Sequence, residues 1–451
     1  MRSNWIEHAI WWQVYPLGFV GAEPALSSSP PIESQPVRHR LGRLQEWLDY
    51  AVELGASGLA LGPVFASQTH GYDTIDYYRI DPRLGDEADF DALIKAAHER
   101  GLRVLLDGVF NHVGRDFPAF AQVLAEGPEA APASWFRLTW PAGPWPPGTE
   151  PDYQRFEGHR ELVALNHDQP EVADLVVAVM NHWLARGADG WRLDAAYAVP
   201  VSFWASVLPR VRAEHPQAYL FGEVLHGDYS EFVRDSTADS VTQYELWKAI
   251  WSSLNDRNFF ELAWALDRHN DLLETFVPLT FVGNHDVTRL ASRLDDDRHL
   301  AHALVILLTV GGTPSIYAGD EQAFRGIKEE RAGGDDAIRP AFPENPSQLA
   351  EFGTPCYRLH QDLIGLRRRH PWLNRAQIRR LNLTNQQFSY ETAGDGGCLL
   401  VALNLADSPA EQSVPGLGVG TLLAGEAVVV DPGSDTARIR LPAHGWAVLD
   451  R

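Results

Sequence analysis

The chain has 451 residues, long enough for two or three domains, one of which can be a large barrel. With 60 acidic and 38 basic side chains, its net charge of −22 argues against nucleic acid or anionic membranes as partners and suits a neutral substrate. Its 2 cysteines are too few for a disulfide framework or a four-ligand zinc site, and no apolar run is long enough for a signal peptide or a bilayer span. We therefore expect a cytoplasmic protein with reduced cysteines and no membrane partner.

Strand-like and helix-like segments alternate from about residue 10 to about residue 370, which indicates a parallel sheet. The candidate strands are Ile10–Tyr15, Gly58–Gly62, Arg103–Val109, Gly190–Asp194, Tyr219–Val224, Ser240–Gln243, Val277–Val282 and Ser315–Tyr317. No glycine-rich phosphate loop follows an early strand, so an open doubly wound sheet is disfavoured. The pattern predicts a closed (β/α)8 barrel, the TIM barrel of the α/β class.

Two of the intervening helices have clear boundaries in the sequence. Apolar residues recur at helical spacing in Phe90–Gly101 and in Pro170–Gly187, and each run stops at its glycine. Proline at the start of the second run suits a first helical turn, where its missing N–H has no partner to lose. Both segments therefore predict helices between barrel strands.

Two stretches interrupt the alternation. Residues 113–166 are rich in Pro, Gly and Trp without a clear period, which is typical of a functional loop or a small inserted domain. After about Pro371, short alternating runs such as Gly397–Leu405 and Leu422–Val430 indicate an antiparallel β-sandwich. We predict barrel segments at 1–112 and 167–370, an inserted domain at 113–166 and a C-terminal sandwich at 371–451.

Four short segments that carry carboxylates follow strand-like runs in a fixed order. They are Asp107-Gly-Val-Phe-Asn111-His112, Gly190-Trp-Arg192-Leu-Asp194, Gly222-Glu223-Val224 and Gly283-Asn284-His285-Asp286. Each one alone has an ordinary structural explanation. Their common position, at the ends of the third, fourth, fifth and seventh strands, predicts one site, because the carboxyl ends of barrel strands meet at a single rim.

Arg192 and Asp194 are two residues apart on a strand, so both side chains face the barrel interior. The guanidinium is expected to keep Asp194 ionised, as a nucleophile requires, although a buried structural ion pair gives the same pattern. Glu223 follows the apolar run Tyr219–Gly222, a setting that would raise its pKa and suit a general acid. Carboxyl groups on neighbouring strands can lie roughly 5–5.5 Å apart, the separation found in retaining glycosidases.

The remaining polar residues of these segments allow two interpretations. His112, His285 and Asp286 suit hydrogen bonds to sugar hydroxyls that strengthen in an oxocarbenium-like transition state. The same residues together with Asp107 include zinc ligands, which makes a metal site the competing interpretation. No ligand spacing of the His-x-x-x-His kind occurs among them, so the sugar-binding interpretation is favoured.

The chain resembles the α-amylase family of retaining glycosidases, glycoside hydrolase family 13. The resemblance rests on the four segments and on Trp11-Trp-Gln-Val-Tyr-Pro16, His70-Gly-Tyr-Asp73 and Gly312-Thr-Pro-Ser-Ile-Tyr-Ala-Gly-Asp-Glu321. It implies that Asp194 is the nucleophile, Glu223 the acid/base and Asp286 the transition-state stabiliser. It also implies that the subsite of the attacked glucose is lined by Tyr72, His112, Arg192 and His285, with Asp107 behind them.

Within the family, Leu165–Val172 and Gly222–His226 look most like the cyclomaltodextrinase and neopullulanase branch, which includes a hydrolase of cyclic maltosyl-maltose. That resemblance implies hydrolysis of α-1,4-glucosidic bonds in cyclic or short maltooligosaccharides through a covalent glucosyl-enzyme. A glucanotransferase or a glucoside-rearranging isomerase would use the same carboxylates. A non-catalytic carbohydrate-binding protein is a further alternative, disfavoured because all three reacting carboxylates are present.

Several residues depart from the family pattern. The barrel begins by Ile10, where the branch usually has a preceding β-domain that builds its dimer, so both monomer and homodimer stay open. Leu225 stands where most of the branch has Trp, which predicts a less aromatic acceptor side of the cleft. Thr69 replaces an Asp of exo-acting relatives and so disfavours a purely exo-acting enzyme.

Two further expectations concern a bound metal ion and the tryptophans of the insertion. Asn111 could ligate calcium, but Ala198 follows Tyr197 where amylases have Lys-His, so we expect no required cofactor or metal. Trp135, Trp140 and Trp145 are equally consistent with stacking on glucose rings and with packing under the insertion.

Overall fold

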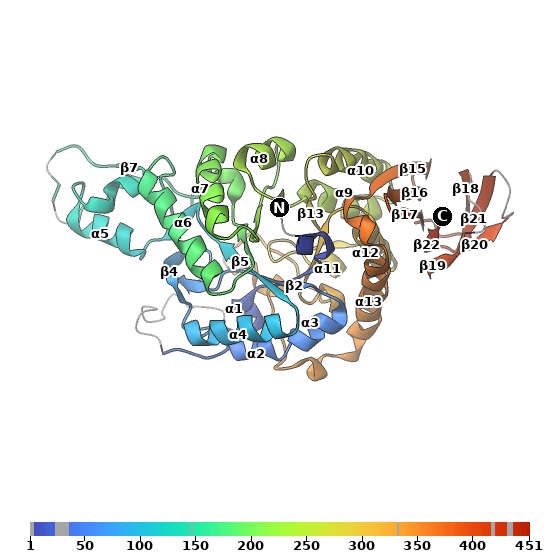
Figure 1. Cartoon of the computed structure of the whole chain (residues 1–451), viewed down its shortest axis with the longest axis horizontal. Coiled ribbons are helices and arrows are strands. Elements are labelled where there is room, and N and C mark those ends of the chain that lie inside the picture. The colour runs from blue at the N-terminus through green and yellow to red at the C-terminus, as the bar shows by residue number, and fades with distance from the viewer. Residues whose placement is uncertain are drawn as a thin grey trace.

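The computed structural model describes residues 4–22, 36–143, 145–146, 148–331, 333–415, 420–430 and 436–451. Figure 1 shows a central barrel, an excursion at the left that holds α5 (Pro118–Glu126) and β7 (Leu138–Thr139), and antiparallel strands at the right. No described helix is both long and apolar enough to cross a membrane.

Among the described residues, one 8-stranded parallel sheet forms the barrel. Its strands are β1 (Trp11–Val14), β2 (Gly58–Leu61), β5 (Arg103–Gly108), β10 (Gly190–Leu193), β11 (Tyr219–Gly222), β12 (Ser240–Val241), β13 (Leu279–Phe281) and β14 (Thr313–Tyr317). They are ordered β12-β11-β10-β5-β2-β1-β14-β13, and a parallel bridge between Thr242 and Leu279 joins the two end strands. The sheet therefore closes, and the predicted TIM barrel is confirmed.

Helices surround this sheet (Figure 1). They are α1 (Pro16–Phe19), α2 (Leu41–Gln45), α3 (Leu48–Leu54), α4 (Glu87–Glu99), α6 (Pro170–Ala185), α7 (Val201–Glu214), α8 (Tyr229–Ser236), α9 (Tyr244–Asn255), α10 (Phe260–Leu273), α11 (Leu290–Arg293), α12 (Leu300–Thr309) and α13 (Thr354–Arg369). The two helices predicted from periodicity are α4 and α6. A capping box of Asp86 and Asp89 starts α4, and Pro170 lies in the first turn of α6. Gly101 and Gly187, which follow these helices, have φ of +75° and +106°, a conformation that favours glycine after a helix.

Alternate residues of the barrel strands explain how the rim is supported. Leu105, Phe221 and Phe281 belong to an apolar cluster inside the barrel, together with Trp11 and Tyr219. The intervening residues of the strands point outward and pack under the helices in the main core. Because strand side chains alternate, Asp107 and Glu223, two residues after members of the inner cluster, face the barrel axis directly above this apolar layer.

The chain leaves the barrel after β5 and returns to it at α6. In this excursion β6 (His112–Gly114) pairs with β9 (Leu162–Ala164), and β7 pairs with β8 (Asp152–Tyr153). A second short hairpin, β3 (Phe65–Ser67) with β4 (Thr74–Ile80), follows β2 and carries Tyr72 between its strands. Both excursions stand at the carboxyl ends of barrel strands, the rim where the predicted site lies.

The C-terminal strands form antiparallel sheets, as predicted. They are β15 (Gln377–Leu383), β16 (Gln387–Gly394), β17 (Gly397–Asn404), β18 (Ala410–Pro415), β19 (Leu422–Gly425), β20 (Val428–Val430), β21 (Thr436–Leu441) and β22 (Trp446–Asp450). The prediction of Leu422–Val430 as one strand is wrong, because β19 joins the five-stranded sheet and β20 the three-stranded one. Gly425, with φ of +82°, ends β19 before the chain changes sheets. The predicted domain boundaries, with barrel segments at 1–112 and 167–370, an inserted domain at 113–166 and a C-terminal sandwich at 371–451, stay a prediction.

Candidate active site

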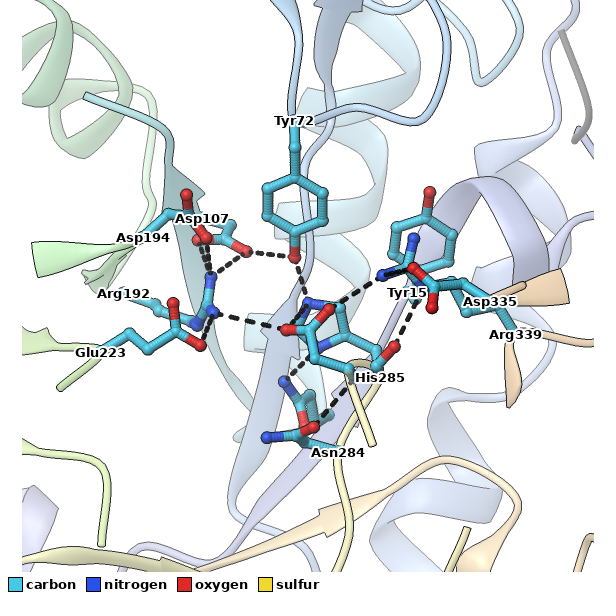
Figure 2. A network of polar contacts seen from close by, with 12 residues as sticks. Tyr15, Tyr72, Asp107, Arg192, Asp194, Glu223, Asn284, His285, Asp335 and Arg339 are labelled. Carbon is cyan, nitrogen blue, oxygen red and sulfur yellow. Dashed lines mark hydrogen bonds and ion pairs between the residues drawn. The ribbon is translucent and has the colours of Figure 1, made fainter. Parts of the chain in front are cut away.

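A single guanidinium lies at the centre of the rim. Strand register places Arg192 of β10 beside Asp107 of β5 and Phe221 of β11. Its Nη1 donates to Asp107 Oδ1 at 2.7 Å and to Asp194 Oδ1 at 3.0 Å, and its Nη2 pairs with Glu223 Oε1 at 2.7 Å. Figure 2 shows the carboxylates gathered around this arginine, whose side chain is 7% exposed. Three neighbouring strands therefore deliver three carboxyl groups to one cation.

The carboxyl groups around Arg192 do not ionise as isolated groups would. Burial raises the pKa of Asp194 well above its usual value, and the charges of Glu223, Asp107 and Asp286 raise it further against the effect of Arg192. Burial also raises the pKa of Asp107, to about 6, although Arg192 opposes it. Arg192 therefore opposes the rise in the pKa of Asp194 without cancelling it, because one guanidinium is shared by several buried carboxylates, and the ionised state of Asp194 stays a prediction.

Glu223 has more polar neighbours than its sequence suggested. Besides the ion pair with Arg192, its Oε1 accepts from the Tyr244 hydroxyl at 3.1 Å and its Oε2 from the Ala195 backbone N–H at 3.1 Å. The predicted apolar setting is wrong, because these groups come from β10, from the turn after it and from α9. The side chain itself is buried, with 9% of its surface exposed.

Asp286 lies on the opposite side of the rim and pairs with a second guanidinium. Arg339 Nη2 donates to its Oδ1 at 2.8 Å, and His285 Nε2 lies 3.0 Å from its Oδ2, while Arg192 is 3.9 Å away. Its backbone N–H donates to the Asn284 side chain at 2.9 Å. Burial alone would raise the pKa of Asp286, but His285, Arg339 and Arg192 together hold it well below its usual range. Asp286 is therefore an anion, in contrast to the group around Arg192.

Three parallel rings orient the polar groups between these two arginines. The Tyr72 and Tyr15 rings both lie parallel to the His285 ring, with centroids 5.6 Å and 5.9 Å from it and 8° between planes. The Arg339 guanidinium lies over both tyrosine rings, 4.6 Å from the centroid of Tyr15 and 5.9 Å from that of Tyr72. The Tyr72 hydroxyl donates to Asp107 Oδ2 at 3.1 Å and also contacts His285 Nε2. These rings thus connect the Arg192 group with Asp286.

Both histidines of the site are neutral at physiological pH. Burial lowers the pKa of His285 to about 3 and that of His112 to about 4. Gln13 Nε2 donates to His285 Nδ1 at 3.0 Å, which leaves the ring proton on the Nε2 that faces Asp286. His112 Nε2 donates to the Tyr72 carbonyl at 2.9 Å, and Asn111 Nδ2 donates to its Nδ1 at 3.0 Å.

These contacts bear on the zinc alternative. Both ring nitrogens of His112 are already paired, so it has no lone pair left for a metal shared with His285 or Asp286. Within the described part of the chain, the groups of three or more ligand atoms that lie close enough to hold one ion do not include these residues. The arrangement supports sugar recognition rather than a metal centre.

A cleft of about 850 Å³ opens over the carboxylates. Tyr72, His112, Asp194, Glu223 and Asp286 line it directly, whereas Asp107, Arg192 and His285 lie behind them. A second cavity of about 780 Å³ shares Tyr72, Phe156, Glu157, Leu162 and Lys328 with the first, so the cleft continues past Tyr72. The eight site residues predicted from the sequence therefore meet at one place.

Aromatic side chains contribute to the lining of the cleft. Leu225, Tyr229, Tyr244 and Trp247 all line it, and the expectation of a less aromatic acceptor side stays a prediction. Phe156, which also lines the cleft, stacks on His112 at 4.7 Å. The described residues that line these two cavities do not include Trp135, Trp140 or Trp145, which favours the packing alternative for those rings.

Four residues that contact the predicted site were missed from the sequence: Arg339, Tyr244, Phe156 and Gln13. Gln13 lies within the run Trp11–Pro16. Tyr244 lies two residues after Thr242, which belongs to the sixth candidate strand. Strand alternation was therefore a usable signal for both residues. Arg339 and Phe156 lie in loops of irregular backbone, where no period or motif singles them out.

Comparison with known protein families agrees with this geometry. The alpha amylase catalytic domain matches residues 13–391 of the chain. A domain of unknown function, DUF3459, matches residues 385–449 and so covers most of the C-terminal sheets.

Individual relatives are similar over nearly the whole chain. A cyclomaltodextrinase of Geobacillus thermopakistaniensis is 29% identical over 472 aligned residues, which cover 99% of this chain and 77% of the relative. Among solved structures, the Nostoc punctiforme debranching enzyme in its native form has a TM-score of 0.83 and 28% identity, covering 100% of this chain and 99% of that one. The ligand-free cyclic α-maltosyl-(1→6)-maltose hydrolase of Arthrobacter globiformis has a TM-score of 0.80 and 27% identity, covering 99% of each chain.

Proposed function

The chain belongs to the alpha amylase catalytic-domain family, and from that premise we propose a retaining glycosidase that cleaves α-1,4-glucosidic bonds in cyclic or short maltooligosaccharides. The relatives named cyclomaltodextrinase and cyclic maltosyl-maltose hydrolase support this substrate class. The observation that carries the proposal is the Arg192 guanidinium, which contacts Asp107, Asp194 and Glu223 at 3.0 Å or less at one rim of the barrel.

In the first step Glu223 donates its proton to the glycosidic oxygen while a carboxylate oxygen of Asp194 bonds to the anomeric carbon. The bond between that carbon and the leaving oxygen breaks, and its electron pair goes to the protonated leaving sugar. The product of this step is a covalent glucosyl ester of Asp194 and an ionised Glu223.

In the second step Glu223 accepts a proton from water, and the water oxygen attacks the same anomeric carbon. Asp194 leaves as a carboxylate, and two inversions at one carbon leave the product in the α configuration. Glu223 regains the proton that it lost, so the site is ready for another cycle.

The carboxyl cluster around Arg192 suits this exchange of a proton. A single guanidinium cannot offset the charge of all the buried carboxylates that surround it, so the cluster retains a proton at pH values where isolated carboxyl groups have lost theirs. We propose that this proton lies on Glu223 in the complex with substrate, where the leaving oxygen meets it. Asp194 is then the ionised carboxyl group that attacks the anomeric carbon.

Asp286 and the stacked rings have a different part in the proposal. Asp286, held as an anion between two arginines, accepts hydrogen bonds from hydroxyls of the attacked glucose that strengthen as positive charge develops on the ring. Tyr72 and His112 line the cleft beside the carboxylates, and neutral His285 lies behind them, where it contacts Asp286 and Tyr72. Arg192 and Asp107 hold the reacting carboxylates in place.

The proposal is tested with Asp194→Asn and Glu223→Gln, which keep side-chain shape and remove the reacting group. Each should lower kcat on maltotriose and on cyclodextrins by about 10³-fold or more, since nucleophile and acid act only in the chemical step. Asp174→Asn, which changes an exposed carboxylate paired with Arg210 on the barrel surface, is the matched control and should keep full activity. Near-normal turnover by either active-site variant would overturn the proposal.

A glucanotransferase or a glucoside-rearranging isomerase shares the first step and differs in the acceptor. Hydrolysis adds one reducing end per bond cleaved, whereas transfer leaves their number unchanged. A panel of cyclodextrins, cyclic maltosyl-maltose, pullulan, starch and maltotriose separates these outcomes and shows whether 1→6 bonds, such as those of cyclic α-maltosyl-(1→6)-maltose, are cleaved. Binding of oligosaccharide without any product would instead support a non-catalytic carbohydrate-binding protein.

We further propose a cytoplasmic monomer or homodimer that needs no metal for catalysis. Cys356 and Cys398 are both free, which favours a reducing compartment. Asn111, the one residue expected to offer a calcium ligand, uses its side-chain amide to orient His112. Activity that survives exhaustive chelation would support this part of the proposal.

A further inference from the structure

Far from the carboxylate rim, a group of imidazole and carboxylate side chains lies between the barrel and the C-terminal sheets. His299 ends a short 3₁₀ helix, η5 (Asp297–His299), that leads into α12 of the barrel, and Asp296 caps this helix through its side chain. His444 lies in the turn between β21 and β22, and Asp407 follows β17. Segments 145 residues apart in the chain therefore meet here.

The ligand atoms of three of these residues converge. His299 Nε2 lies 3.0 Å from His444 Nδ1 and 4.0 Å from Asp296 Oδ2, and all three atoms are within 4.8 Å of one another. Ligands of a tetrahedral zinc ion stand about 3.3 Å apart, given metal–ligand distances near 2.0–2.1 Å. The two nitrogen atoms are therefore close to coordination spacing, and the Asp296 carboxylate would have to move toward them.

A fourth residue orients the second imidazole as in zinc proteins. His444 Nε2 donates to Asp407 Oδ1 at 2.9 Å, which leaves the lone pair of Nδ1 directed at His299. A carboxylate that accepts the outer N–H of a metal-binding histidine is a common feature of zinc sites.

The three residues lie at the edge of the buried interior. Both imidazoles are buried, with 2% and 6% of their side chains exposed, and Asp296, at 27%, borders solvent.

Two guanidinium groups oppose a cation at this place. Arg298 donates to both oxygens of Asp296, and Arg257 donates to Asp407 Oδ2 at 2.9 Å. Arg298 is 58% exposed, so its side chain can turn to solvent and leave Asp296 Oδ2 to a metal, while its backbone N–H keeps the bond to Oδ1. Arg257 donates to Asp407 Oδ2 and to the Leu405 carbonyl rather than to a ligand residue, so it need not move.

We propose that Asp296, His299 and His444 bind one zinc or similar divalent transition-metal ion, with water as the fourth ligand, and that this ion ties the C-terminal sheets to the barrel. Two nitrogen ligands and one carboxylate suit zinc better than calcium, which prefers oxygen ligands. The role is structural and independent of the proposed glycosidase activity.

The test uses the full chain, freed of metal by chelation and titrated with Zn²⁺ by calorimetry. We expect one ion per chain and a rise of several degrees in Tm with excess Zn²⁺, because an ion bound only by the folded state stabilises it. Titration with Co²⁺ should give visible absorption bands of four-coordinate cobalt. Absence of stoichiometric Zn²⁺ binding at micromolar protein would overturn the proposal.

Variants locate the ion. His444→Gln should abolish binding, and Asp407→Asn, a change at a carboxylate that is 69% exposed and tolerates substitution, should weaken it by about 10- to 100-fold. His39→Gln is the control, because His39 forms the other such group of the described residues, with Asp86 and Asp89, but is exposed. Equal Zn²⁺ affinity in wild type and Asp407→Asn, or a loss in His39→Gln alone, would contradict the assignment.

Discussion

Two buried arginines organise the cleft, and they do so with opposite electrostatic results. Arg192 is shared among Asp107, Asp194 and Glu223, and burial raises the pKa of Asp107 and of Asp194. Asp286 lies between Arg339 and Arg192, and its pKa falls well below the usual range. The ratio of cations to carboxylates, rather than the presence of an arginine, therefore decides which acids of a buried site ionise.

The difference suits the two tasks that the proposed mechanism sets. A general acid needs a proton that stays on the protein near neutral pH, and an excess of carboxylates around one cation retains such a proton. A transition-state stabiliser needs a fixed negative charge, and two cations around one carboxylate provide it. Substitutions that change the number of cations or carboxylates around Arg192 or around Asp286 test this comparison.

The largest effect is expected from Arg192→Met, which removes the one cation that, among the described residues, contacts Asp107, Asp194 and Glu223. The carboxyl groups should then hold protons to higher pH, and kcat on maltotriose should fall by about 10³-fold or more, because the nucleophile is neutral and loses its orientation. Circular dichroism checks the fold, and Arg210→Met, at an exposed ion pair, is the control. Activity within tenfold of wild type would contradict the central role of Arg192.

Arg339→Gln should have the next largest effect. It leaves Asp286 with a more distant cation at 3.9 Å and removes the donor to the His285 carbonyl, so kcat should fall by about 10- to 100-fold through misplacement of Asp286. Arg339→Lys restores the charge without the planar fork and should recover only part of the activity. If Gln and Lys variants were equally active, the charge on Arg339 would not matter to Asp286.

The pH dependence of kcat/KM tests the raised pKa of Asp194. Protonation of Asp194 should reduce activity on the acid side, at a pH well above the usual carboxyl pKa, because its pKa in the folded protein is raised. Asp107→Asn removes a neighbouring negative charge and frees Arg192 for the others, so the acid limb should move to lower pH by about 1 unit. A limb that moves to higher pH would show that Asp107 does not raise the pKa of Asp194.

Tyr244→Phe should have the smallest effect of this series. It removes one neutral hydrogen bond to Glu223 Oε1 and leaves the ion pair with Arg192 in place, so kcat should fall only about 2- to 10-fold. A fall as large as that of Arg339→Gln would mean that Tyr244, rather than Arg192, positions the acid. Steady-state kinetics on maltotriose measures both variants under the same conditions.

Residues on the strands were predictable and residues on the loops were not. Asp107, Arg192, Asp194 and Glu223 occupy alternate positions at strand ends, so counting along the sequence places them on one face. Arg339 reaches Asp286 from a loop 53 residues later in the chain, and no local pattern gives the path of that loop. Phe156 enters the cleft from the insertion in the same way.

The wrong expectation for Glu223 has a related cause. Glu223 follows an apolar strand and was expected in an apolar setting, yet Arg192 of the neighbouring strand reaches it. Tyr244 of a later helix donates a hydrogen bond to the same carboxyl group. The polar environment of Glu223 therefore comes from segments that are distant in sequence.

The order of strands and helices, the closed barrel, the C-terminal sheets and the face on which the carboxylates lie all follow from residue order, because strand alternation and helical spacing are local properties that a barrel repeats regularly. The charge state of each carboxyl group depends instead on how many cations reach it. That number was decided only by the tertiary structure, since it depends on the register of neighbouring strands and on loops that bring Arg339 to Asp286 and His444 to His299.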